Sequence, residues 1–190
     1  MNFKLKSIKG TYREVADACR NTIGMAEGTG EPSDSWKRRI LMSEHSPIRK
    51  LSVTGKWYDL PYWVSTHFVR HKYGIEHFVS TQRTDRRSDG VKRDDAPQGQ
   101  AVTHEVEVNA QALINISRKR LCHCASPETQ RAWREVKNEI AKTDPILASV
   151  MVKECVYRGF CPEFKCCGYN KTRAFEKELA EYRKGINDAD

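Results

Sequence analysis

The spacing of the apolar residues changes at Gly74, and this change limits the folds open to the chain more than any other feature. Upstream, residues 60–71 carry apolar or aromatic side chains at close to helical spacing. Downstream, Ile75, Phe78 and Val79 precede a polar run, which is typical of a short strand or extended segment. A predicted helix therefore leads directly into a predicted strand, which favours a fold that mixes both elements.

The rest of the chain shows the same interleaving. Apolar and polar residues alternate in two further segments, which predicts strands over residues 51–57 and 101–108. Helical spacing and capping residues predict helices over residues 11–23, 36–42, 109–121, 126–142 and 144–155. We expect loops over residues 24–35 and 84–100, the second being polar and flexible, and a charged helix or tail over residues 171–190. The predicted fold is α+β, in one domain over residues 1–190.

The charge balance favours anionic partners. The 190 residues include 33 Lys and Arg against 25 Asp and Glu, which gives a formal net charge of +8. Nucleotides, folate-type carboxylates and nucleic acid suit such an excess. No apolar run approaches the roughly 20 residues that a membrane-spanning helix needs, and the first ten residues lack the apolar core of a signal peptide. We therefore expect a cytoplasmic protein without a membrane partner.

The seven cysteines are predicted to be free thiols rather than a disulfide framework. Their number is odd, and the expected compartment is reducing. The sequence contains no Cys-x-x-Cys pair, and the adjacent Cys166 and Cys167 are poorly spaced for tetrahedral zinc. We predict no metal site and assign the cysteines no nucleophilic role.

A basic turn and a polar run flank the strand predicted after Gly74. Arg70, His71 and Lys72 come at the end of the helix, and the polar run that follows the strand is Ser80, Thr81, Gln82 and Arg83. Guanidinium forks with nearby hydroxyl and amide groups suit a phosphorylated, planar ligand. A solvated basic surface explains the same residues equally well.

A second polar cluster lies on the helix predicted over residues 109–121. Asn109 and Asn115 offer amide groups that can read the edge of a heterocycle, although they are six positions apart and so share a direction on the helix only loosely. Arg118, Lys119 and Arg120 gather at the helix C-terminus, where the helix dipole favours cations. Ordinary capping of the helix end accounts for these residues as readily as ligand binding does.

Taken together, these segments resemble the flavin-dependent thymidylate synthases. The family signature is Arg-His-Arg, seven residues, then Ser, and Arg70-His71-Lys72 followed by Ser80 is similar to it. Asn109, Asn115 and Arg120 resemble its Asn-x-Arg-x-x-x-Asn and Leu-x-Arg segment. Glu44-His45-Ser46-Pro47 resembles its cofactor-contacting turn, and residues 155–163 are similar to a C-terminal stretch of some members. The matches occur in the family's order and cover most of the chain.

The resemblance implies a fold, a reaction and a set of site residues. The fold is an antiparallel sheet flanked by helices, and the reaction is reductive methylation of dUMP to dTMP in a homotetramer with active sites between subunits. FAD is the implied cofactor, and NADPH and methylenetetrahydrofolate are the implied co-substrates. The implied cofactor-binding residues are His45, Ser46, Arg70, His71, Lys72, Asn109, Gln111 and Asn115. The implied substrate-binding residues are His67, Arg70, Ser80, Thr81, Gln82, Arg83 and Arg120, of which Arg120 is also catalytic. We expect Ser80 and Arg83 to bind phosphate, because no base is expected within reach to activate the Ser80 hydroxyl as a nucleophile.

Several departures from the family pattern keep other functions open. Lys72 and Gln111 each replace an arginine, Phe78 a glutamate and His67 a glutamine, and the segment between Ser80 and Asn109 is short. A related flavoenzyme that acts on another pyrimidine nucleotide, such as dCMP, is the second hypothesis. A basic nucleic-acid-binding protein is the third, although its candidate aromatic residues, which are Trp57, Tyr58, Tyr62 and Trp63, have the spacing of core residues.

Overall fold

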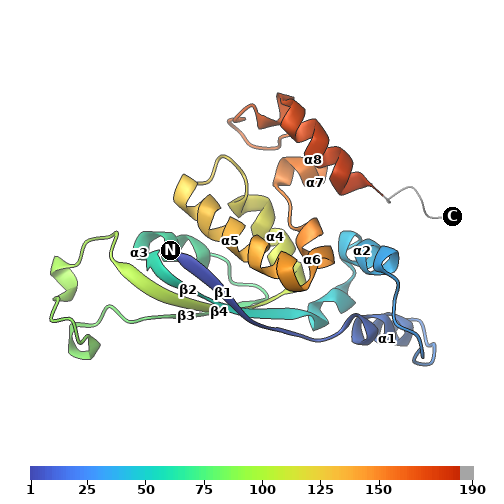
Figure 1. Ribbon diagram of the computed structural model, residues 1–190, viewed down its shortest axis with the longest axis horizontal. Coiled ribbons are helices and arrows are strands. Elements are labelled where there is room, and N and C mark those ends of the chain that lie inside the picture. Colours follow the sequence, from blue (N-terminus) through green and yellow to red (C-terminus); the bar gives the residue numbers. More distant parts are fainter. Residues whose placement is uncertain (185–190) are drawn as a thin grey trace.

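A four-stranded antiparallel sheet organises the protein. The structure is a computed structural model and describes residues 1–184. The sheet order is β1-β2-β4-β3, with bounds β1 Asn2–Lys9, β2 Ser52–Pro61, β3 Ile75–Val79 and β4 Ala101–Asn109 (Figure 1). The predicted α+β class and the three predicted strands are confirmed. Strand β1 was not predicted, because its register shifts between Leu5 and Ser7 and so interrupts the alternation of its side chains.

The core lies between one face of this sheet and the helices. Trp57 of β2 is fully buried and stacks on Phe68 at a ring-centroid distance of 4.8 Å. Gly55 makes room for the ring of Phe3, because a Cβ atom there would lie 2.1 Å from Cζ of Phe3. Three helices, α3 Tyr62–Val69, α4 Ala110–Arg120 and α5 Pro127–Thr143, lie on this face of the sheet (Figure 1). The buried Trp57 cannot serve as an exposed platform for nucleic-acid bases.

Most helices begin where a capping residue predicts. Helix α1 (Tyr12–Thr22) begins after Thr11, which forms a capping box with Glu14, and α2 (Asp34–Met42) begins after Ser33. Asn109 caps α4, and Ser126 caps α5. Helix α8 (Arg173–Arg183) confirms the predicted charged helix, and residues 185–190 of the predicted tail lie outside the described residues.

Three predicted boundaries were wrong. The helix expected from residue 36 begins at Asp34, because Ser33 caps it. The helix expected from residue 60 begins at Tyr62, because Leu60 and Pro61 still pair with β4. The helix expected over residues 144–155 is divided into α6 (Pro145–Val150) and α7 (Glu154–Arg158). Between them Met151 leaves helical geometry, and its carbonyl accepts a hydrogen bond from Nζ of Lys137 at 2.8 Å. A partner distant in sequence thus stabilises the break.

The remaining segments are short turns and loops. Within residues 1–184 there are four 3-10 turns, which are η1 Ser46–Lys50, η2 Thr84–Arg86, η3 Arg93–Asp95 and η4 Tyr169–Lys171. The segment 84–100 extends past the end of the sheet (Figure 1). Arg87 crosslinks this segment, because its guanidinium donates to Gln82 at 2.6 Å and to Gln100 at 3.2 Å. None of the helices within residues 1–184 is long and apolar enough to cross a membrane.

Candidate active site

Arg120 and His71 form the centre of the candidate site. Nε of Arg120 donates to Nε2 of His71 at 2.9 Å, and an Nη2 proton of Arg120 goes to the backbone carbonyl of His67 at 2.6 Å. The last turn of α4 therefore lies against the turn that follows α3. The two family-like segments, 49 residues apart, are thereby brought together.

The hydrogen bond from Arg120 determines the protonation of His71. A guanidinium has only donors, so Nε2 of His71 must be an acceptor and the ring proton must lie on Nδ1. Burial, followed by the charge of Arg120, lowers the pKa of His71 to about 4. His71 is therefore a neutral donor at pH 7 rather than a third cation beside Arg70 and Lys72.

A cavity of about 220 Å³ opens where the basic turn faces α4. Its walls come from the turn and from one face of the helix, and they are formed by Arg70, His71, Lys72, Tyr73, Ala112, Asn115 and Ile116. Two cations, a neutral imidazole and an amide thus converge on one small space. That combination suits a phosphate group or the polar edge of a ring.

Asn109 joins this cavity to the sheet. Its side chain accepts the amide proton of Ala112 at 2.9 Å, and its backbone N–H donates to the carbonyl of Gly74 at 2.9 Å. Gly74 has a φ of +71°, and a Cβ atom there would lie 2.5 Å from Nδ2 of Asn109. Glycine is thus needed at this turn both for its backbone conformation and for space.

Gln111, another predicted cofactor residue, is occupied by a different partner. Its amide donates to Glu44, and Arg118 also donates to the Glu44 carboxylate. Arg118 lies over the ring of Tyr157 at 3.5 Å and donates to Oδ1 of Asn115 at 3.2 Å. The Glu44–Arg118 pair was not predicted, because 74 residues separate its members and no local pattern signals the pairing.

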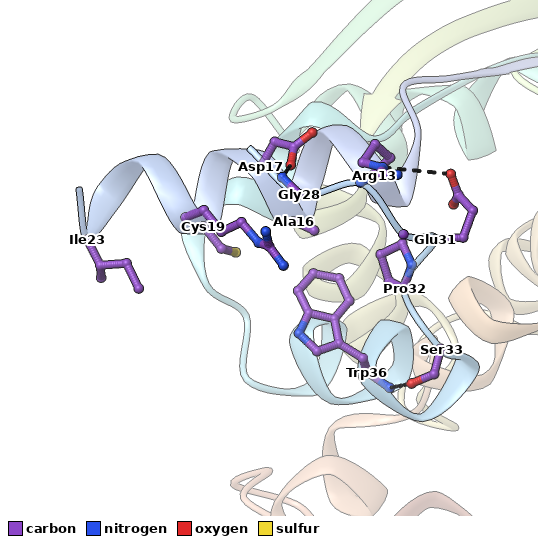
Figure 2. Close-up of a pocket in the computed structure, with 12 residues that line it drawn as sticks. Arg13, Ala16, Asp17, Cys19, Ile23, Gly28, Glu31, Pro32, Ser33 and Trp36 are labelled. Atoms are coloured by element: carbon purple, nitrogen blue, oxygen red, sulfur yellow. Dashed lines mark hydrogen bonds and ion pairs between the residues drawn. The ribbon is translucent and has the colours of Figure 1, made fainter. Parts of the chain in front are cut away.

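His45 and Ser46 open onto a different cavity. It measures about 570 Å³, and Trp36 and Cys19 also lie on its wall. Trp36 and Cys19 also line a neighbouring pocket of about 410 Å³ between α1 and α2. Figure 2 shows Trp36 facing Ala16 and Cys19 across that pocket, with the Arg13–Glu31 ion pair of 3.9 Å at its edge.

The predicted phosphate ligands lie at the far end of β3 from the basic turn. Ser80 continues the ladder: its N–H donates to the carbonyl of Thr103 at 2.9 Å, and its Oγ accepts the N–H of Thr103 at 3.1 Å. Arg83 donates twice to Asp85, at 3.0 and 2.6 Å, while Gln82 accepts from Arg87. Residues 80–83 do not line the cavity formed by the basic turn and α4. The predicted role of Ser80, Thr81, Gln82 and Arg83 stays a prediction.

The comparisons with known proteins identify the fold. No protein-family model and no curated protein matches the sequence. Among solved structures, the flavin-dependent thymidylate synthase ThyX from Helicobacter pylori, complexed with FAD and dUMP, aligns with a TM-score of 0.66 and 13% identity, covering 80% of this chain and 100% of that one. The UMP/dUMP methylase PolB from Streptomyces cacaoi, bound with 5-Br dUMP, aligns with a TM-score of 0.64 and 14% identity, covering 84% and 95%. The chain has the fold of the flavin-dependent thymidylate synthases.

This fold agrees with the resemblance carried by the motifs. The predicted antiparallel sheet flanked by helices is confirmed. At these low sequence identities, the comparison shows a shared backbone fold only. The chemistry has to be inferred from the side chains. Those side chains fall into three groups within one chain: the cavity at residues 70–73, the cavity at residues 45–47, and the strand end at residues 80–83.

Proposed function

We propose that this chain is a flavin-dependent methylase of a pyrimidine nucleotide, and specifically a thymidylate synthase that converts dUMP to dTMP. The observation that carries the proposal is the Arg120–His71 pair beside a cavity walled by Arg70, Lys72 and Asn115. It combines phosphate-binding cations with donors that suit a heterocycle, in a fold shared with enzymes crystallised with FAD and dUMP.

The residues present fit FAD, provided that the site is larger than one cavity. A volume of about 220 Å³ is below the roughly 300 Å³ of small ligand pockets, so it suits a phosphate or part of a ring. Arg70 and Lys72 would hold phosphate, Nδ1 of His71 would donate one neutral hydrogen bond, and Asn115 would meet a ring edge. When bound, FAD supplies the redox and group-transfer chemistry.

In the proposed reaction, Arg120 stabilises charge on the pyrimidine. Two of its five N–H donors are used by His71 and His67, and these two bonds fix the plane of the guanidinium. The remaining donors can meet a uracil carbonyl as negative charge develops on it. Such preorganised donors need no rearrangement during the reaction.

The proposed assembly is a homotetramer with sites between subunits. It is supported by the cavity at residues 70–73, which Ser80–Arg83 of the same chain do not line and to which a second subunit would bring its own Ser80–Arg83 segment. NADPH and methylenetetrahydrofolate are the proposed co-substrates. The seven free thiols suit the reducing cytoplasm, where we place the enzyme.

Flavin binding tests the proposal first. We expect the purified protein to quench the fluorescence of added FAD with saturation, and Arg70→Ala to weaken this binding by about tenfold or more, as for loss of a charge-assisted hydrogen bond. Arg131→Ala, a matched change on the exposed surface of α5, should bind FAD as the parent does. A parent protein that does not quench FAD would reject the flavoenzyme and favour the nucleic-acid hypothesis.

A further inference from the structure

A chain of hydrogen bonds lies beneath the basic turn, formed by groups that the proposed reaction does not use. Oγ of Ser65 in α3 lies 3.0 Å from Nδ1 of His104 in β4. Nε2 of His104 lies 2.9 Å from Nδ1 of His77 in β3, and Nε2 of His77 lies 2.9 Å from the backbone carbonyl of His71. Ser65 is 1% exposed and His104 is fully buried. The chain therefore connects the buried interior to the turn that carries Arg70, His71 and Lys72.

The chemistry of the last acceptor sets the proton on His77. A backbone carbonyl only accepts, so Nε2 of His77 must carry a proton. With His77 neutral, its Nδ1 is an acceptor, so Nε2 of His104 must donate. Nδ1 of His104 then accepts from the hydroxyl of Ser65. Every donor in the chain points toward the turn.

The surroundings favour this neutral arrangement over a charged one. Within residues 1–184, no carboxylate hydrogen-bonds to the ring of His77 or His104. On the site side, the cation Arg120 contacts His71, to whose carbonyl His77 bonds. Glu76, Glu105 and Glu107 occupy the alternate positions on the strands, which point to the other face of the sheet. An imidazolium at the fully buried His104 would lack a counter-charge.

The hydrogen bonds through Ser65, His104 and His77 hold the basic turn from one side, and Arg120 holds it from the other. His77 fixes the carbonyl of His71, and Arg120 fixes its ring through Nε2. The N–H of His71 donates to the carbonyl of Phe68 at 2.9 Å, which joins the turn to α3. Backbone and ring of His71 are thus both constrained, and Nδ1–H is the ring donor left for a ligand.

We propose that Ser65, His104 and His77 are positioning residues that hold the basic turn so that Arg70, Lys72 and the neutral Nδ1–H of His71 face the ligand together. This series of hydrogen bonds is not a proton relay, because it ends on a backbone carbonyl that can neither release nor accept a transferable proton. The geometry of these hydrogen bonds does not depend on the proposed function. Only the identity of the ligand, a flavin with phosphate groups, rests on the proposed function.

The proton positions are measured directly by long-range ¹H–¹⁵N correlation on protein labelled with ¹⁵N-histidine, without flavin. At pH 7 we expect neutral rings at all three positions, with Nε2–H at His77 and His104 and the less common Nδ1–H at His71. An imidazolium or an Nε2–H ring at His71, or an Nδ1–H ring at His104, would overturn the assignment.

Substitutions at His104 test whether the chain positions the turn. His104→Phe keeps an aromatic ring to pack against Trp57, whose centroid is 5.4 Å away, but removes both hydrogen bonds. We expect the affinity for FAD to fall tenfold or more, and His104→Gln, which restores a donor for His77, to recover most of it. His123→Phe, a matched change beside Tyr169 outside the chain, should stay within twofold of the parent.

The outcomes separate this inference from the proposed function. Equal FAD affinity in the parent, His104→Phe and His104→Gln would overturn the positioning role. Loss of affinity in His104→Phe that His104→Gln does not restore would also count against it, because general disruption of the core explains that pattern. Should His104→Phe not fold, Ser65→Ala makes the same test with a smaller change. A parent that binds no FAD rejects the proposed function, and the proton positions then decide the inference alone.

Discussion

Nε of Arg120 lies 2.9 Å from Nε2 of His71, and this bond makes the histidine a neutral donor in an otherwise cationic turn. A protonated His71 would place two donors in opposition. The pair also joins α4 to the turn after α3, so the side chain proposed for catalysis and the side chains proposed for phosphate binding form one unit.

Removing Arg120 should change both the reaction and the titration of His71. Turnover by Arg120→Ala should fall by about 10²–10³-fold, the typical loss for one preorganised donor, with flavin still bound. Arg120→Lys should not restore it well, because an ammonium lacks the planar fork. In Arg120→Ala the pKa of His71 should rise from about 4 but stay below its usual value, because burial, the larger cause, remains.

NMR titration of the His71 ring follows the second effect, with Arg131→Ala as control. An unchanged pKa of His71 in Arg120→Ala would show that the pair is not formed in solution. Full activity in the same variant would remove Arg120 from the catalytic machinery.

Stability should fall as the pH is lowered from about 6.5 to about 4. Burial is the main cause that lowers the pKa values of His71 and His104 to about 4, whereas an unfolded histidine titrates near 6.5. The unfolded state therefore binds more protons in this range, and the stability present above pH 6.5 is lost as pH falls toward 4. Urea unfolding at several pH values measures the loss. His104→Gln should show a shallower dependence than the parent, and identical slopes would contradict the assignment.

Asn109 should contribute to stability through the start of α4. Asn109→Ala removes the acceptor for the N–H of Ala112 and should lower the free energy of unfolding by about 1 kcal/mol. Asn109→Asp keeps an acceptor and should cost much less. Urea denaturation distinguishes the two, and equal losses would show that the cap hydrogen bond is not what Asn109 contributes to stability.

The Glu44–Arg118 pair should be worth more than surface ion pairs. The two side chains are only 17% and 13% exposed, so Glu44→Ala leaves a poorly solvated guanidinium and should cost about 3 kcal/mol. Lys9→Ala, which breaks the exposed Lys9–Glu107 pair, should change stability by less than about 1 kcal/mol. Chemical denaturation compares them. Similar small losses would show that Arg118 finds water or another partner.

Local patterns predicted the elements of the fold well. The capping residue Ser126 located the start of α5, and alternation located β2, β3 and β4. Strand β1 was missed because a register shift interrupts its alternation, and the break between α6 and α7 was missed because its stabilising partner, Lys137, is distant in sequence. Hydrophobic repeats with a period of 3.6 or 2 residues indicate only the local geometry of a helix or a strand.

The candidate site was predictable as a set of residues but not as an arrangement. The basic turn and the Asn109–Arg120 helix were found from their motifs, yet the neutral state of His71 depends on a partner 49 residues away. The hydrogen bond from Gln111 to Glu44 was not predictable for the same reason, and the cofactor-binding role of Gln111 stays a prediction. His77 and His104 carried no signal, since single histidines in strands usually reflect packing.

Light scattering with FAD present tests the proposed assembly. We expect a mass of four times the chain mass of 21.9 kDa, because residues 80–83 do not line the cavity at residues 70–73 of the same chain and a second subunit is proposed to supply them. A mass near 21.9 kDa at micromolar concentration would contradict the proposal that sites form between subunits.

Tritium release from C5-labelled dUMP, with FAD, NADPH and methylenetetrahydrofolate present, tests the central claim most directly. UMP and dCMP labelled at the same position, run in parallel, decide which pyrimidine nucleotide is the substrate. We predict release from dUMP by the parent protein and a loss of about 10²–10³-fold in Arg120→Ala. No release from any of the three nucleotides by a parent protein that has bound FAD would contradict the claim that this chain is a pyrimidine nucleotide methylase.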